Sequence, residues 1–184
     1  DHPQWDPNDG PYNTGDRVIY QGYVFEARWY TTSEPGIYGN PWIEITDEWR
    51  NYNVYKKDDI VEYNGSKYKA HYNMDPDRQP IPTPGMIGSP WQELTSEWRN
   101  FNIYKEGDIV EMNGSQFKAR QYVNPGAAAP GTLTGTWDEI TNEWRNFNVY
   151  NSGDTVEYMG HTYRARWYSH NEIPGAASVW TLVN

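Results

Sequence analysis

Hydrophobic and polar residues alternate over short stretches that recur along the chain. In residues 59–72, DIVEYNGSKYKAHY, Val61 and Tyr63 alternate with polar or flanking positions, the chain turns at Asn64-Gly65, and the alternation then resumes. Alternation with a period of two predicts strands, and Asn-Gly between two such runs predicts a tight hairpin because both residues tolerate positive φ. The corresponding turns lie at Gln21-Gly22, Asn113-Gly114 and Met159-Gly160. No stretch has a convincing helical pattern, so we predict an all-β protein.

The hairpin pattern belongs to a longer repeat, Tyr-x3-Asp-x-Val-x3-Gly-x2-(Tyr/Phe)-x-Ala. Its four copies begin at Tyr12, Tyr55, Tyr104 and Tyr150. Each copy is preceded by one tryptophan and followed by another, and the Asp is expected to cap backbone donors of a turn. The repeat predicts a tandem array of four small antiparallel β modules, at residues 1–47, 48–96, 97–142 and 143–184. Modules of about 45 residues lie near the lower limit for independent folding, so shared packing at the joints is expected.

The joints between modules have nearly the same sequence: WIEITDEWRNYNVY, WQELTSEWRNFNIY and WDEITNEWRNFNVY. They lack the Gly, Ser and Pro of flexible linkers, so we expect a rigid, elongated rod. We expect the arginines Arg50, Arg99 and Arg145 to stack on the neighbouring Trp or to pair with Glu. The glutamate pairs Glu44/Glu48, Glu93/Glu97 and Glu139/Glu143 are interpreted as a solvated charged face rather than as hydrolytic carboxylates.

Composition narrows the classes of function. Only 36% of the residues are hydrophobic, but 16% are aromatic, with ten Trp, sixteen Tyr and four Phe, which favours small β units with rings left at the surface. A net charge of −10 argues against nucleic-acid binding, which requires clustered Lys and Arg. No apolar run is long enough for a membrane span. The four histidines, His2, His71, His161 and His170, lack metal-ligand spacing, so we expect neither metal nor cofactor.

An aromatic pair follows the second strand of the first and fourth copies, in ARWYTTSEPG (27–36) and ARWYSHNEIPG (165–175). Continued strand alternation would place Trp29 on the packed face with Phe25 and Ala27, and Tyr30 on the face toward water. Trp29 is therefore interpreted as either an edge-of-core residue or a binding ring. For Tyr30 and its counterpart Tyr168, exposure beside a tryptophan favours a binding platform.

The combined pattern, W…Y..GD.V.Y.G..Y.A.WYT…PG…W, resembles the type-3 chitin-binding domain, that is, carbohydrate-binding module family 5/12. The first copy carries it as YNTGDRVIYQGYVFEARWYTTSEPG and the fourth as YNSGDTVEYMGHTYRARWYSHNEIPG. The resemblance implies a small β module whose exposed aromatic rings bind the flat face of chitin or cellulose. It implies binding rings at Trp29, Tyr30, Trp167 and Tyr168, with a further ring at Trp5 or Trp144.

The two middle copies depart from this pattern. Tyr72 and Asn73 occupy the pair's positions in the second copy, and Gln121 and Tyr122 occupy them in the third. We expect these modules to bind less well through Tyr72 and Tyr122, or to act as spacers. The insert at 75–88 and the alanine-rich segment at 124–135 either bind a different ligand or are longer surface loops, and we favour surface loops.

These sequence features are compatible with two alternative functions. The first is non-catalytic, secreted binding of insoluble β-1,4-linked polysaccharide, chitin above all, by aromatic stacking with multivalent avidity, in a free-standing protein or as part of a larger secreted enzyme or adhesin. The alternative is a structural or lectin-like recognition array, such as a spike or tail segment, that binds glycoprotein glycans or packs mainly on itself. A hydrolase ranks last, because the sequence shows no recognisable catalytic cluster.

Overall fold

The computed structural model describes residues 1–36, 41–77 and 79–184 of the chain. Throughout these residues the secondary structure is strand, turn and bend without a helix, which confirms the predicted all-β class. The chain divides into two compact units, Asp1–Leu94 and Thr95–Asn184. Each predicted module contains one three-stranded antiparallel sheet, so each unit contains two such sheets.

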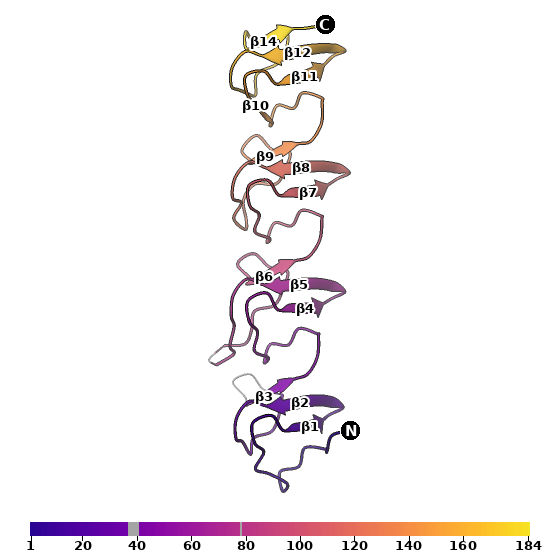
Figure 1. Ribbon diagram of the computed structural model, residues 1–184, viewed down its shortest axis with the longest axis vertical. Coiled ribbons are helices and arrows are strands. Elements are labelled where there is room, and N and C mark those ends of the chain that lie inside the picture. Colours follow the sequence, from indigo (N-terminus) through magenta and orange to yellow (C-terminus); the bar gives the residue numbers. More distant parts are fainter. Residues whose placement is uncertain (37–40, 78) are drawn as a thin grey trace. The chain divides into compact units, whose positions relative to one another are not determined.

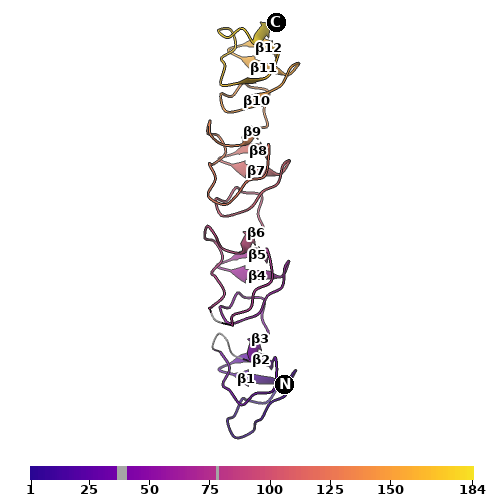
Figure 2. The ribbon, with the colours of Figure 1, turned by 90° about the vertical axis from the view of Figure 1, so that its left-hand side faces the viewer.

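In the first unit, two sheets have the orders β1-β2-β3 and β4-β5-β6. Figure 1 shows the hairpin turn of each sheet at one end and the segment that follows the second strand at the other end. In Figure 2 the latter segment faces the viewer. The strands are β1 (Arg17–Tyr20), β2 (Tyr23–Ala27), β3 (Trp42–Glu44), β4 (Ile60–Tyr63), β5 (Ser66–Ala70) and β6 (Trp91–Glu93).

The second unit repeats this topology, with the orders β7-β8-β9 and β11-β12-β14, and adds a two-stranded β10-β13 pair. Its strands are β7 (Ile109–Met112), β8 (Ser115–Ala119), β9 (Trp137–Glu139), β10 (Val149–Tyr150), β11 (Thr155–Tyr158), β12 (His161–Ala165), β13 (Ser169–His170) and β14 (Trp180–Leu182). The β10-β13 pair joins the start of the last repeat to the segment just after its second strand.

The predicted hairpin turns are confirmed. Asn64 and Gly65 have φ of 48° and 80°, the two positive values that a two-residue type I′ turn requires. The corresponding pairs of the other three modules also have positive φ at both residues. The predicted role of the Asp is confirmed as well, because Asp59 Oδ2 accepts a hydrogen bond of 2.8 Å from the Lys56 amide. Asp16, Asp108 and Asp154 do the same three residues upstream.

Each module has a small aromatic core built around its closing tryptophan. In the first module Trp42 is fully buried, and its ring lies edge-on to Tyr12 at a centroid distance of 5.3 Å. Val18 and Phe25, which are opposite each other in the β1-β2 register, complete this core. The same Tyr–Trp contact occurs in the other modules at 5.0, 5.1 and 5.2 Å. The repeated residues therefore mainly build the fold, which leaves fewer rings for a ligand.

The joint between the first two modules contains a buried carboxylate, contrary to the predicted solvated face. Glu44, at the end of β3, accepts hydrogen bonds from Arg50 Nε at 2.9 Å and Arg50 Nη2 at 3.2 Å, and a third from the Tyr52 hydroxyl. Asn53 closes the joint from the other side, because its side chain bonds both the amide and the carbonyl of Glu44. The predicted Arg–Glu pairing is confirmed here, but Glu48, the second carboxylate of the motif, lies exposed.

In the second unit, the joint between its two modules has the same construction. Arg145 bonds both carboxylate oxygens of Glu139, at 3.1 and 3.3 Å, and Asn148 bonds the Glu139 backbone on both sides. Phe147 takes the place of Tyr52 and packs against Phe117 at 6.2 Å. The joint motif therefore ties each of these module pairs together through side-chain contacts to the last strand of the preceding module.

Alkaline pH is expected to destabilise the first joint through Tyr52. The pKa of the Tyr52 phenol is raised by its burial, and further by the hydrogen bond to Glu44 and the charge of that carboxylate. A raised folded-state pKa means that the stability due to the neutral phenol is fully present below about pH 10, the unfolded value, and is lost as the pH rises beyond it.

The measurement is urea denaturation at pH 8 and at several values above pH 10, for the wild type and the Tyr52→Phe variant. Phenylalanine is the natural residue at this position in the second unit, so the variant keeps the packing and removes the ionisable group. We expect the wild type to lose more stability than the variant as the pH rises. Parallel losses would contradict the role of Tyr52.

Candidate functional site

The first candidate site is a bend that projects Trp29 and Tyr30 from the end of β2. The Arg28 amide donates to the Pro41 carbonyl at 2.6 Å, and Thr31 exchanges two backbone hydrogen bonds with Tyr12, at 2.8 and 2.9 Å. The two aromatic residues lie between these two fixed points. Trp29 is 46% exposed and Tyr30 is 64% exposed. Two neighbouring rings therefore lie at the surface on a backbone that is held at both ends.

The fourth module builds the same bend. The Arg166 amide donates to the Val179 carbonyl at 2.8 Å, and Tyr150 pairs with Ser169 in the β10-β13 ladder. Between them, Trp167 is 50% exposed and Tyr168 is 60% exposed. The same backbone contacts therefore hold the pair at both ends in this module, with Ser169 in place of Thr31 and Val179 in place of Pro41.

Trp29 does not lie on the packed face that continued strand alternation predicts for it, and its counterpart Trp167 is exposed as well. β2 ends at Ala27 and β12 ends at Ala165, so the period of two does not apply two residues further on. The bend turns the tryptophans out instead. The interpretation of Trp29 as an edge-of-core residue is therefore wrong, and its exposure is compatible with a binding ring.

Arg28 is a residue of this site that the sequence reasoning missed. Its guanidinium carbon lies 4.5 Å from the centroid of the Trp29 ring, a cation–π distance. Arg28 Nη2 also pairs with Asp75 Oδ2 of the second module at 2.8 Å. These two contacts hold the indole from one face. The signal available in the sequence was the Arg that directly precedes Trp-Tyr in both complete copies, ARWY.

The middle modules present single rings at the same bend. Tyr72 and Tyr122 are both exposed, and the residues beside them are polar. Asn73 does not face outward freely, because its Oδ1 accepts a hydrogen bond of 2.8 Å from the Lys57 amide. Gln121 is exposed. Each middle module therefore offers one aromatic ring where the end modules offer two.

The two additional rings implied by the resemblance, Trp5 and Trp144, lie in a different environment. Trp5 packs edge-on against Tyr20 at 5.8 Å, and Trp144 packs edge-on against Tyr158 at 5.4 Å. Their indole nitrogens are buried. The backbone of Trp5 also pairs with Ile19, its amide donating at 2.8 Å. These rings cover the hairpins of their modules and are not brought together with the exposed pairs.

Other chemistry is sparse in the part of the chain that the structure describes. Within it, no three His, Cys, Asp or Glu side chains gather as a metal site would require. None of the described segments is a helix of the length and apolarity needed to cross a bilayer. His71 and His170 each bury Nε2, and burial lowers the pKa of His71, which favours the neutral ring.

A comparison with curated proteins found no match. The sequence pattern of carbohydrate-binding module family 5/12 matches residues 48–92 and 143–181, which lie inside the predicted second and fourth modules. The family binds carbohydrate and is non-catalytic. The matched residues contain the exposed Tyr72 in one segment and the Trp167–Tyr168 pair in the other. Segments 48–92 and 143–181 of the chain therefore belong to carbohydrate-binding module family 5/12.

Proposed function

We propose that the protein is a secreted, non-catalytic binding protein for insoluble β-1,4-linked polysaccharide, and for chitin in particular. The observation that carries this proposal is the exposed Trp–Tyr pair on a fixed bend, at Trp29–Tyr30 and at Trp167–Tyr168. A β-1,4-linked chain is a ribbon whose sugar faces carry C–H groups, and such faces stack on aromatic rings while the hydroxyl groups stay in water.

The strength of binding follows from the number of rings. By analogy with bases that stack on aromatic side chains, one ring contributes about 1–3 kcal/mol. Two rings give weak binding once the cost of association is subtracted. Several such sites on one chain gain about 10²–10⁴ in avidity on a polymer that they can engage together. We therefore propose that the repeats serve retention on an insoluble surface, with the end modules as the principal sites and the middle modules as weaker ones.

Binding to chitin is expected to be nearly independent of salt. The chain carries a net charge of −10, and attraction to cationic, deacetylated chitin would be screened almost completely at about 1 M salt. Stacking has no such dependence. The measurement is depletion of the protein from solution by chitin, cellulose and chitosan, at low and at about 1 M salt.

We expect retention on chitin at both salt concentrations and weaker retention on cellulose. A strong loss on chitin at high salt would show that charge, not stacking, carries the affinity. No depletion by any of the three polymers would contradict the proposed function and leave the structural or lectin-like array in its place.

A further inference from the structure

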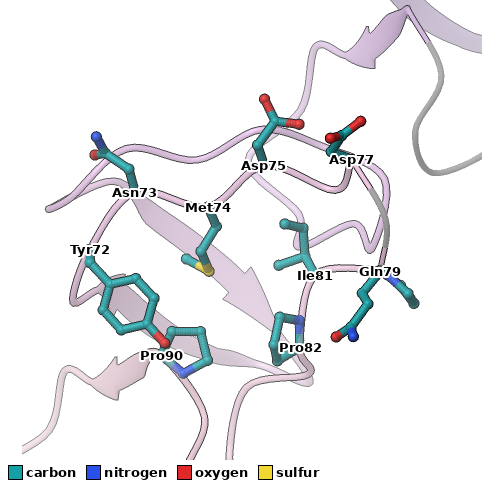
Figure 3. Close-up of a pocket in the computed structure, with 10 residues that line it drawn as sticks. Tyr72, Asn73, Met74, Asp75, Asp77, Gln79, Ile81, Pro82 and Pro90 are labelled. Carbon is teal, nitrogen blue, oxygen red and sulfur yellow. The ribbon is translucent and has the colours of Figure 1, made fainter.

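The second module has a hollow that is not part of the exposed aromatic pairs of the end modules. It has a volume of about 430 Å³ and lies between the segment after β5 and the loop that precedes β6. Figure 3 shows Tyr72, Met74, Ile81, Pro82 and Pro90 around it. Met74 and Ile81 are buried, whereas Tyr72 is exposed. The hollow thus has an apolar floor and an aromatic wall. The insert at 75–88, expected to be a surface loop, supplies much of its lining.

The apolar floor is fixed by backbone contacts to the core of the module. Met74 exchanges two hydrogen bonds with Tyr55, at 2.7 and 2.9 Å, and the Ile81 amide donates to the Asn51 carbonyl at 2.8 Å. The Pro82 carbonyl accepts a hydrogen bond of 2.9 Å from the indole of the buried Trp91. A floor held in this way is formed before any ligand arrives, which lowers the cost of binding.

The charged residues of the rim are turned away from the floor. In Figure 3 the carboxylates of Asp75 and Asp77 point to the opposite side from Tyr72, Ile81 and Pro82. Asp75 is moreover paired with Arg28 of the first module at 2.8 Å. Figure 3 shows the neutral Met74 and Pro90 nearer to the ring of Tyr72 than Asp75 and Asp77, which also line the hollow.

We propose that this hollow binds one N-acetylglucosamine unit of the polymer, with its pyranose ring stacked on Tyr72 and its acetamide methyl group against Met74 and Ile81. This inference rests on the proposed function and adds to it. A flat aromatic pair stacks equally on glucose and on N-acetylglucosamine, whereas a methyl-sized apolar floor beside the stacking ring distinguishes them. The volume lies within the range of about 300–1,000 Å³ typical of small-molecule sites.

The size of the preference follows from one methyl group. Burying a methyl-sized apolar group makes binding about fourfold tighter, according to the area-based scale. We therefore expect the hollow to favour N-acetylglucosamine oligomers over glucose oligomers by about four- to tenfold. The second module would then be the part of the chain that discriminates chitin from cellulose, although it has only one platform ring.

The test is methyl-resolved NMR of the full chain, titrated with chitohexaose, cellohexaose and the glucosamine hexamer. The reporters are the Met74 ε-methyl and Ile81 δ1-methyl groups. The partly buried Met112 of the third module and the exposed Met159 of the fourth serve as controls in the same sample. We expect saturable shifts of Met74 and Ile81 with chitohexaose, at least fourfold weaker binding of cellohexaose, and unmoved controls.

Two variants at the ring make the assignment specific. Tyr72→Ala is expected to weaken chitohexaose binding at Met74 and Ile81 by tenfold or more, because stacking on the ring is lost. Tyr72→Trp, which installs the residue of the end modules, is expected to keep or tighten it. Tyr72 is exposed, so neither change should unfold the module, and an unchanged far-ultraviolet spectrum checks this.

Each other outcome overturns a different statement. If the methyl signals of Met74 and Ile81 did not shift although chitin depleted the protein from solution, the hollow would be refuted as a binding site and the proposed function would stand. Equal shifts with cellohexaose would refute recognition of the acetamide. Tighter binding of the glucosamine hexamer would place the ligand against Asp75 and Asp77 instead. Shifts at the hollow without depletion by chitin would support the hollow and refute polymer binding.

Discussion

Replacing Trp29, Tyr30, Trp167 and Tyr168 together by alanine should lower the affinity for insoluble chitin by at least about a hundredfold. Each lost ring removes about 1–3 kcal/mol of stacking, and the loss of two sites also removes the avidity between them. Variants that lack the pair in one module only should lose less, because the other end module still holds the polymer. The measurement is a binding isotherm on chitin for the wild type, both single-module variants and the combined variant.

The fold should survive these changes, because all four rings are exposed by 46–64% and their backbone is held by neighbouring residues. A matched control replaces two other exposed side chains, Tyr23→Ala and Met159→Ala, which lie at the hairpin ends of their sheets. This control should bind chitin like the wild type. If instead the combined ring variant bound like the wild type, the site would have to lie elsewhere, for example at Trp5 and Trp144.

Local chemistry explains why the hairpins could be predicted. The turn at Asn64-Gly65 depends only on the φ preferences of two adjacent residues, and the carboxylate of Asp59 reaches a backbone amide only three residues away. The closing tryptophans could likewise be placed, because each follows a Pro-Gly loop at a similar position in the repeat. Interactions between residues that are close in the sequence could therefore be predicted.

Contacts between distant segments explain what could not be predicted. Trp29 is exposed because the Arg28 amide bonds the Pro41 carbonyl and the backbone of Thr31 pairs with that of Tyr12. The sequence around Trp29 does not indicate these partners. The hollow of the second module similarly needs Tyr72 and Pro90, which meet only in the folded chain. The solvated face predicted for Glu44 is wrong for a different reason. Its partners Arg50 and Tyr52 are only six and eight residues away, and the predicted Arg–Glu pairing does not by itself show that this carboxylate is buried.

Replacing Glu44 by alanine should destabilise the first unit by about 3 kcal/mol, the lower end of the range for breaking a buried ion pair. The Glu44 side chain is only 3% exposed, and its loss leaves the Arg50 guanidinium, itself 27% exposed, without its carboxylate partner. The Tyr52 hydroxyl loses its acceptor at the same time. The partly exposed arginine can still reach water, which is why the lower end of the range applies.

The second unit provides the matched comparison in the same chain. The Glu139 side chain is 13% exposed and Arg145 is 36% exposed, and Phe147 stands where Tyr52 does, so no phenol loses a partner. Glu139→Ala should therefore cost only about 1 kcal/mol, close to the value for a surface pair. Native-state hydrogen exchange resolves the two joints, since residues 42–55 and 137–150 give separate peptides. Equal losses of protection in the two variants would show that burial of the carboxylate does not set the strength of the joint, and that the Asn53 and Asn148 contacts to the backbone hold the modules together instead.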